Sequence, residues 1–257
     1  MELNLHEWGD AGAPPVVCLH GVTAHGRRFR KLAEERLAAH FHVLAPDLRG
    51  HGFSEWEPPW TIATYAHDVL ETLDAAGVRR APFVGHSLGG RIALEIAALD
   101  RERIERAALL DPAIQILPHV GYDFAERERV GEVYASPEEA ITSKFTENNC
   151  PRAFIEEEVR EHLAEGRDGT FRFRYCQSAA VSLFGELCTP PPPAETMRAP
   201  TLLLYADVFG LVREEQVEAY RAALGDLLEI VTVPGGHVVY WEAYDETAAA
   251  VERFLTA

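Results

Sequence analysis

The chain is short of basic residues and of cysteines. Among its 257 residues, 24 lysines and arginines are outnumbered by 41 aspartates and glutamates, for a formal net charge of −17. A field of this sign repels phosphate groups, so nucleic acid is excluded as a partner. The four cysteines lack C-x-x-C spacing, which argues against both a metal site of the zinc type and a dense disulfide framework.

Long apolar runs are also missing. No stretch is long enough to span a membrane, and the N-terminus has no basic segment followed by an apolar one. We therefore expect no membrane partner, no export signal and a cytoplasmic location. Hydrophobic residues still make up 47% of the chain, enough for a substantial core, with or without an inserted subdomain.

Strand and helix patterns alternate along most of the chain. Apolar strand patterns occupy residues 3–8, 15–19, 41–47, 81–86, 103–110, 200–206 and 228–233. Amphipathic helix patterns occupy residues 27–39, 61–76, 91–99, 213–224 and 244–256. This alternation predicts an α/β fold with a mostly parallel sheet covered by helices on both faces.

The alternation breaks after Pro112. Residues 113–196 have helical and strongly acidic segments and close with a proline run at 190–193. We interpret this stretch as a helical cap whose proline run is a stiff return linker. The cap is inserted into a core formed by residues 1–112 and 197–257.

A serine lies at the turn between an apolar strand and a helix pattern. Residues 83–90 read F-V-G-H-S-L-G-G, which places Ser87 in a G-x-S-x-G motif. The glycines permit a tight turn in which the serine takes a strained backbone conformation that exposes its hydroxyl, and the N–H of Leu88 is free to stabilise an oxyanion. His86 is expected to line the substrate pocket. The alternative is a glycine-rich turn with a helix-capping serine.

A serine nucleophile needs a base and a second oxyanion donor nearby. His237 follows the last strand on a glycine loop, at the same sheet edge as Ser87. The strand at 15–19 leads into His20-Gly21, which makes the N–H of Val22 a candidate donor. We expect His20 to hold this loop by hydrogen bonds and to border the substrate site.

Four motifs together resemble the α/β-hydrolase fold, in its capped esterase, lactonase and C–C hydrolase branch. They are H-G-V-T at 20–23, D-L-R-G-H-G at 47–52, G-H-S-L-G-G at 85–90 and P-G-G-H at 234–237. The resemblance implies that Ser87 is the nucleophile and His237 the base. It also implies that the backbone N–H groups of Val22 and Leu88 form the oxyanion hole.

The acid partner departs from the usual family pattern. In most of the family the catalytic aspartate follows the seventh strand, and that position falls on Phe209 here. The nearby Asp207 matches a neighbouring acidic position whose side chain generally does not face the histidine. Some relatives carry the acid after the sixth strand, where Asp111 lies 24 residues beyond Ser87. We favour Asp111 over Asp207, while a strand-end turn aspartate remains the alternative for Asp111.

The sequence therefore predicts a serine hydrolase that cleaves a small carboxylic ester or lactone through an acyl-enzyme on Ser87. It needs no metal or organic cofactor and is expected to be a monomer or homodimer. The alternatives are a C–C bond hydrolase of a dienone-type acid, with Arg91 as the candidate that holds its carboxylate, and a non-enzymatic ligand receptor. Candidate cap residues for the pocket are Phe124, Tyr134, Phe145, Phe184 and Leu187.

Overall fold

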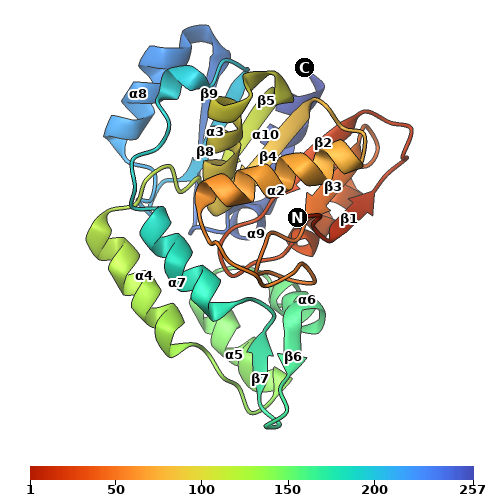
Figure 1. The fold of residues 1–257 in the computed structure, drawn as a ribbon, viewed down its shortest axis with the longest axis vertical. Coiled ribbons are helices and arrows are strands. Elements are labelled where there is room, and N and C mark those ends of the chain that lie inside the picture. Colours follow the sequence, from red (N-terminus) through yellow and green to blue (C-terminus); the bar gives the residue numbers. More distant parts are fainter.

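A seven-stranded sheet forms the centre of the computed structural model, which describes all residues 1–257 (Figure 1). The strand order is β1-β3-β2-β4-β5-β8-β9. Strand β1 is antiparallel to β3, and all other neighbours are parallel, as predicted. The strands are β1 (Leu5–Trp8), β2 (Pro15–Leu19), β3 (His42–Pro46), β4 (Ala81–His86), β5 (Ile104–Leu110), β8 (Thr201–Ala206) and β9 (Leu228–Val233).

Helices cover both faces of this sheet and divide its core in two. One face packs against α2 (Ile62–Ala75), α3 (Leu88–Leu99) and α8 (Glu214–Leu224). The other packs against η1 (Gly26–Phe29), α1 (Arg30–Leu32), η2 (Ala33–Leu37), α9 (Val239–Glu242) and α10 (Tyr244–Thr256). Three further short 3-10 turns are η3 (Arg101–Arg103), η4 (Ala194–Thr196) and η5 (Gly225–Leu227). No helix combines the length and the apolar character that crossing a membrane requires.

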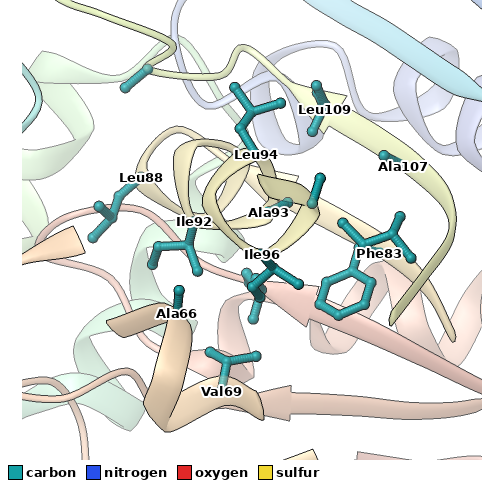
Figure 2. Packing of buried hydrophobic residues seen from close by; sticks show 14 of the residues in the cluster. Ala66, Val69, Phe83, Leu88, Ile92, Ala93, Leu94, Ile96, Ala107 and Leu109 are labelled. Carbon is teal, nitrogen blue, oxygen red and sulfur yellow. The ribbon is translucent and has the colours of Figure 1, made fainter. Parts of the chain in front are cut away.

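Helix α3, which begins directly after Ser87, is fixed by its packing. Figure 2 shows Ile92 and Ile96 of α3 on the side that faces α2, where Val69 lies, with the sheet residue Phe83 beside Ile96. All four side chains are fully buried, and burying a side chain of this size contributes about 1.5–3 kcal/mol. The start of α3 therefore has a well-defined position at the sheet edge.

The helix predicted over 27–39 has a different local form. The chain there makes a 3-10 turn, a short α-helical turn and a π-helical turn in succession. Phe29, Leu32 and Leu37 are nevertheless buried, as their spacing indicated. The apolar pattern specifies which side chains enter the core, whereas the type of helical turn also depends on packing against the sheet.

The segment between β5 and β8 extends from one end of the sheet (Figure 1). Its helices are α4 (Pro118–Val130), α5 (Pro137–Glu147), α6 (Arg152–His162) and α7 (Gln177–Glu186). Besides the predicted helices it contains an antiparallel pair, β6 (Leu163–Glu165) and β7 (Phe171–Phe173). These strands are too short for a clear alternating pattern in the sequence. The boundaries expected for core and cap stay a prediction.

The turn after β4 leaves no room for side chains at its glycines. A Cβ at Gly89 would lie 2.0 Å from the carbonyl oxygen of Leu19 in β2. At Gly85 it would lie 2.6 Å from the carbonyl oxygen of Gly89. Because the neighbouring atoms belong to the backbone, they cannot move aside as a side chain can. These glycines let α3 approach β2 and β4 closely.

The different surroundings of Gly89 and Gly185 predict opposite effects when each is replaced by alanine. Gly89→Ala should lower the free energy of unfolding by more than about 2 kcal/mol, because the methyl group overlaps the backbone of β2. Gly185→Ala should raise it by about 0.5–1 kcal/mol, because Gly185 lies within α7 with no heavy atom within 4 Å of the added Cβ. Urea unfolding of both variants measures the change in the free energy of unfolding. Equal changes in the two variants would contradict the close contact of Gly89 with β2.

Four of the five buried histidines are almost completely enclosed. His20, His51, His86 and His162 are each at most 2% exposed. Burial lowers the pKa of all four below the usual range, to about 4 for His51. Each ring is therefore neutral in the native protein at pH values where the same side chain is protonated in the unfolded chain.

The protein is expected to lose stability as the pH falls below about 6.5. Below this pH the four histidines take up protons when the chain unfolds. The free energy of unfolding is therefore greatest above the histidine pKa of the unfolded chain, and it declines as the pH falls toward the lower pKa of the folded protein. Each histidine contributes up to about 1.4 kcal/mol per pH unit. Denaturant unfolding at several pH values between 7.5 and 5 should show a shallower decline in His162→Phe than in the wild type. The exposed His119→Phe is the control, and an unchanged slope in His162→Phe would count against this explanation.

Candidate active site

Ser87 occupies the strained turn predicted by the sequence. Its backbone has φ 52° and ψ −115°, a left-handed conformation that a residue with a side chain rarely adopts. The residue lies between the end of β4 and the first residue of α3 and is 7% exposed. The turn thus holds the hydroxyl-bearing residue at the carboxyl edge of the parallel sheet, where ligands of such sheets bind.

His237 and Asp111 meet at the same edge. The Nδ1–H of His237 donates a hydrogen bond to Oδ2 of Asp111 over 2.5 Å. Asp111 follows β5 and is fully buried, and its Oδ1 accepts the backbone N–H of Ala206 over 3.2 Å. The carboxylate is thereby fixed by two partners, and the bond to Nδ1 leaves Nε2 of His237 as the proton-accepting atom.

Asp207 does not contact His237. It is exposed at the start of the loop after β8, and its backbone N–H donates to the carbonyl oxygen of Val233. The loop instead brings Phe209 to the histidine, with ring centroids 4.9 Å apart and planes 15° from parallel. Of the two carboxylates considered from the sequence, the structure brings Asp111 to the imidazole.

The two candidate oxyanion donors adjoin Ser87. Leu88 is the first residue of α3, so its N–H has no acceptor within the helix, while its side chain packs in the core (Figure 2). The loop after β2 lies against the turn, since a Cβ at Gly21 would be 3.1 Å from Cβ of Ser87. The next N–H, that of Val22, has no backbone acceptor. Both groups are available to a bound oxygen.

The expectation that His20 borders the substrate is corrected by the structure. Its Nε2 accepts the N–H of Leu48, and its Nδ1–H donates to the carbonyl oxygen of Gly21. The ring is fully buried and does not line the cavity. His20 connects two loops, which agrees with the part of the prediction that it holds its loop.

His86 lines the cavity and also contacts His237. Its Nε2–H donates to the main-chain carbonyl oxygen of His237 over 2.9 Å, and the two ring centroids are 4.6 Å apart. Its Nδ1 is buried without a partner. Burial and the neighbouring His237 lower the pKa of His86, so a neutral ring supports the loop that carries His237.

A cavity of about 500 Å³ opens beside Ser87 and His237. Its apolar lining includes three of the cap residues predicted to line it, Phe124, Phe184 and Leu187. Tyr134 is buried inside the cap instead, and Phe145 is 43% exposed on its surface. Periodicity shows that such residues are apolar but does not show which face of a cap helix turns toward the site.

The lining also includes charged side chains, which the sequence did not indicate. Arg28 donates from Nε and Nη2 to Oε1 of Glu158, over 3.1 and 2.5 Å, and Oε2 of Glu158 lies 2.9 Å from Nε2 of His25. Burial acts to raise the pKa of Glu158, but Arg28 and His25 outweigh it and keep the pKa well below its usual range. Arg28 and Glu158 thus form an ionised pair. No spacing signal relates them, because they lie 130 residues apart.

Carboxylates outnumber cations around the cavity by five to three. The acidic side chains are Glu128, Glu132, Glu147, Glu158 and Glu242, and the basic ones are Arg28, Arg127 and Lys144. Arg91 is elsewhere, donating to the carbonyl oxygens of Ile114 and Pro190. No group of three or more His, Cys, Asp or Glu side chains has the arrangement of a metal site.

The sheet order, the strained serine turn and the histidine–aspartate pair define an α/β hydrolase. In agreement, the family model described as "alpha/beta hydrolase fold" matches residues 14–244, and the chain belongs to this family. The predicted family and fold are confirmed.

Among curated relatives, lipase LipV of Mycobacterium tuberculosis is 29% identical over 99% of this chain and 98% of its own length. Esterase YbfF of Escherichia coli is 32% identical over 62% of this chain and 57% of its own. Among solved structures, E-2-(acetamidomethylene)succinate hydrolase has a TM-score of 0.90 at 23% identity, covering 99% of this chain and 95% of that one. The enol-lactonase of Burkholderia xenovorans LB400 has a TM-score of 0.79 at 24% identity, covering 99% and 96%. These two structural likenesses concern the fold.

The geometry around His237 predicts different effects for the two aspartates. Asp111→Asn should lower the kcat for p-nitrophenyl acetate by about 10³- to 10⁴-fold, because the amide cannot hold the imidazole in the required tautomer. Asp207→Asn should stay within about twofold of the wild type, because the exposed carboxylate has no contact with the ring. Steady-state assays of both purified variants compare them, and the reverse ranking would show that Asp207 is the acid.

Proposed function

We propose that the protein is a carboxylic ester hydrolase acting on small esters or lactones through an acyl-enzyme on Ser87. The observation that carries this proposal is the convergence of Ser87, the hydrogen-bonded pair of His237 and Asp111, and two free backbone N–H groups at one cavity. The relatives named as an esterase and a lipase, and the structural neighbour named as an enol-lactonase, support ester chemistry.

In the proposed first step, the hydroxyl oxygen of Ser87 attacks the ester carbonyl carbon while Nε2 of His237 takes the hydroxyl proton. The buried carboxylate of Asp111 stabilises the imidazolium that forms. The N–H groups of Val22 and Leu88 stabilise the oxyanion. His237 then returns the proton to the departing alcohol, which leaves the acyl group on Ser87.

The second step repeats this chemistry with water. His237 takes a proton from a water molecule, whose oxygen attacks the acyl carbon, and the same two N–H groups stabilise the new oxyanion. Collapse of the intermediate returns a proton to Ser87 and releases the carboxylic acid. For a lactone, the alcohol and the acid are parts of one product molecule.

Cavity size and charge narrow the substrate class. A volume of about 500 Å³ suits one small molecule and disfavours a long-chain triglyceride. The apolar side chains of Phe124, Phe184 and Leu187 in the lining suit a short acyl or alcohol group. The excess of carboxylates disfavours a substrate with its own carboxylate, which counts against the alternative of a C–C hydrolase for a dienone-type acid. That alternative also lacks the anchor expected from Arg91.

Wild-type protein mixed rapidly with p-nitrophenyl butyrate is expected to release a burst of p-nitrophenol comparable to the enzyme concentration, provided that deacylation is the slower step. Ser87→Ala should abolish both the burst and the turnover, because no acyl-enzyme can form. Stopped-flow absorbance measures the burst, and mass spectrometry of quenched samples detects the acyl group on the peptide that contains Ser87.

Turnover of acyl chains from two to twelve carbons, and of lactones of increasing ring size, should then decline toward the long chains. Retained turnover in Ser87→Ala would contradict the acyl-enzyme. Binding of esters or lactones without any turnover would favour the receptor alternative.

A further inference from the structure

We propose that Phe209 is a positioning residue for His237, in an inference that rests on the proposed function. Its ring stacks on the imidazole, with centroids 4.9 Å apart and an interplanar angle of 15°. Phe209 is nevertheless 41% exposed, so burial alone does not account for its position. A large aromatic side chain that stays partly in water while covering a reactive ring suggests a role in the reaction.

The loop that carries Phe209 is anchored to Asp111 and to the strand that leads to His237. Its first anchor is the N–H of Ala206, which donates to Oδ1 of Asp111 over 3.2 Å. Its second anchor is the N–H of Asp207, which donates to the carbonyl oxygen of Val233 in β9, the strand that leads to His237. Val212, near the other end of the loop, is buried. The loop therefore keeps a defined position relative to the imidazole.

The imidazole is flanked by two rings. The His86 centroid lies 4.6 Å from that of His237 at an interplanar angle of 40°, and Phe209 stacks nearly parallel to it. With Nδ1 bonded to Asp111, these contacts oppose tilting and rotation of a side chain that is still 25% exposed. Phe209 thus helps to hold the imidazole in the orientation that its bond to Asp111 gives it.

The stacked ring also affects the charge that develops during catalysis. When His237 takes the proton of Ser87, the imidazole becomes a cation within reach of the electron-rich face of Phe209. A cation at this distance from an aromatic face is stabilised. The contribution is larger for the imidazolium than for the neutral ring, so it acts on the transition state and is expected in kcat more than in KM.

Phe209→Leu should lower the kcat for p-nitrophenyl butyrate by about threefold to thirtyfold with KM changed by less than about twofold, because leucine fills space but has no aromatic face. Phe209→Tyr should keep kcat near the wild-type value, because it restores the ring. Phe53→Leu, at an exposed phenylalanine outside this cavity, is the matched control and should leave both constants unchanged.

NMR provides a readout that does not depend on turnover. The ring current of a stacked phenylalanine shifts the imidazole proton resonances of His237. This shift should be lost in Phe209→Leu and kept in Phe209→Tyr. The activity assay and the NMR measurement therefore test separate claims. Wild-type protein without esterase activity would refute the proposed function, and the His237 resonances would still test whether Phe209 stacks on the imidazole.

Three outcomes would overturn the positioning role. A change confined to KM in Phe209→Leu would make Phe209 a substrate contact only. Equal losses of kcat in Phe209→Leu and Phe209→Tyr would show that the aromatic face is not what matters. Unchanged His237 resonances in Phe209→Leu would show that the rings do not stack in solution.

Discussion

The site depends on one backbone constraint, the left-handed conformation of Ser87 between β4 and α3. A residue with a side chain adopts this conformation only where its surroundings enforce it. Here the enforcement comes from the contact of Gly89 with the backbone of β2 and from the packing of α3 against α2 and the sheet. The two hydrophobic cores thereby fix a hydroxyl group at the sheet edge, to which the loops after β2, β5 and β9 bring its partners.

Because the carboxylate that binds His237 follows β5, the loop after β8 does not have to carry an acidic residue for this role. Asp111 reaches Nδ1 of His237 from a fully buried position and is held by the N–H of Ala206 at the end of β8. The β8 loop therefore supplies a backbone donor to the acid instead of the acid itself. Its side chains are free for another use, and Phe209 lies against the imidazole.

The sequence was most informative where local chemistry determines structure. The G-x-S-x-G motif predicted a strained serine between strand and helix, and the alternating patterns predicted the parallel sheet and most of its helices. Strand order placed His237 at the edge occupied by Ser87, and helix–strand spacing brought Asp111 to that edge. These inferences depended on residues close in sequence, on the general rule that parallel strands share one carboxyl edge and, for Asp111, on the family resemblance.

Other features depend on contacts between distant segments, which no local pattern encodes. His20 follows a strand at the site edge, yet its ring turns inward to accept the N–H of Leu48. The stacking of Phe209 could not be inferred from a loop without periodicity. The cap was predicted as helical, but its β6–β7 pair and the side chains that face the cavity required the tertiary structure, since each cap helix is largely half-buried or exposed.

The charged wall of the cavity also explains how the cap is held against the core. Arginines at 27, 28 and 30 meet glutamates 161, 158 and 157 of α6. The outer pairs are partly exposed, and such pairs contribute little. In the inner pair Glu158 is buried and the side chain of Arg28 is 14% exposed, so removing Arg28 should cost up to about 3–5 kcal/mol because it leaves the Glu158 charge uncompensated. The same pair therefore helps to hold α6 in place and lines the cavity that contains Ser87, so the position of the cap and the chemistry of the pocket are linked through this contact.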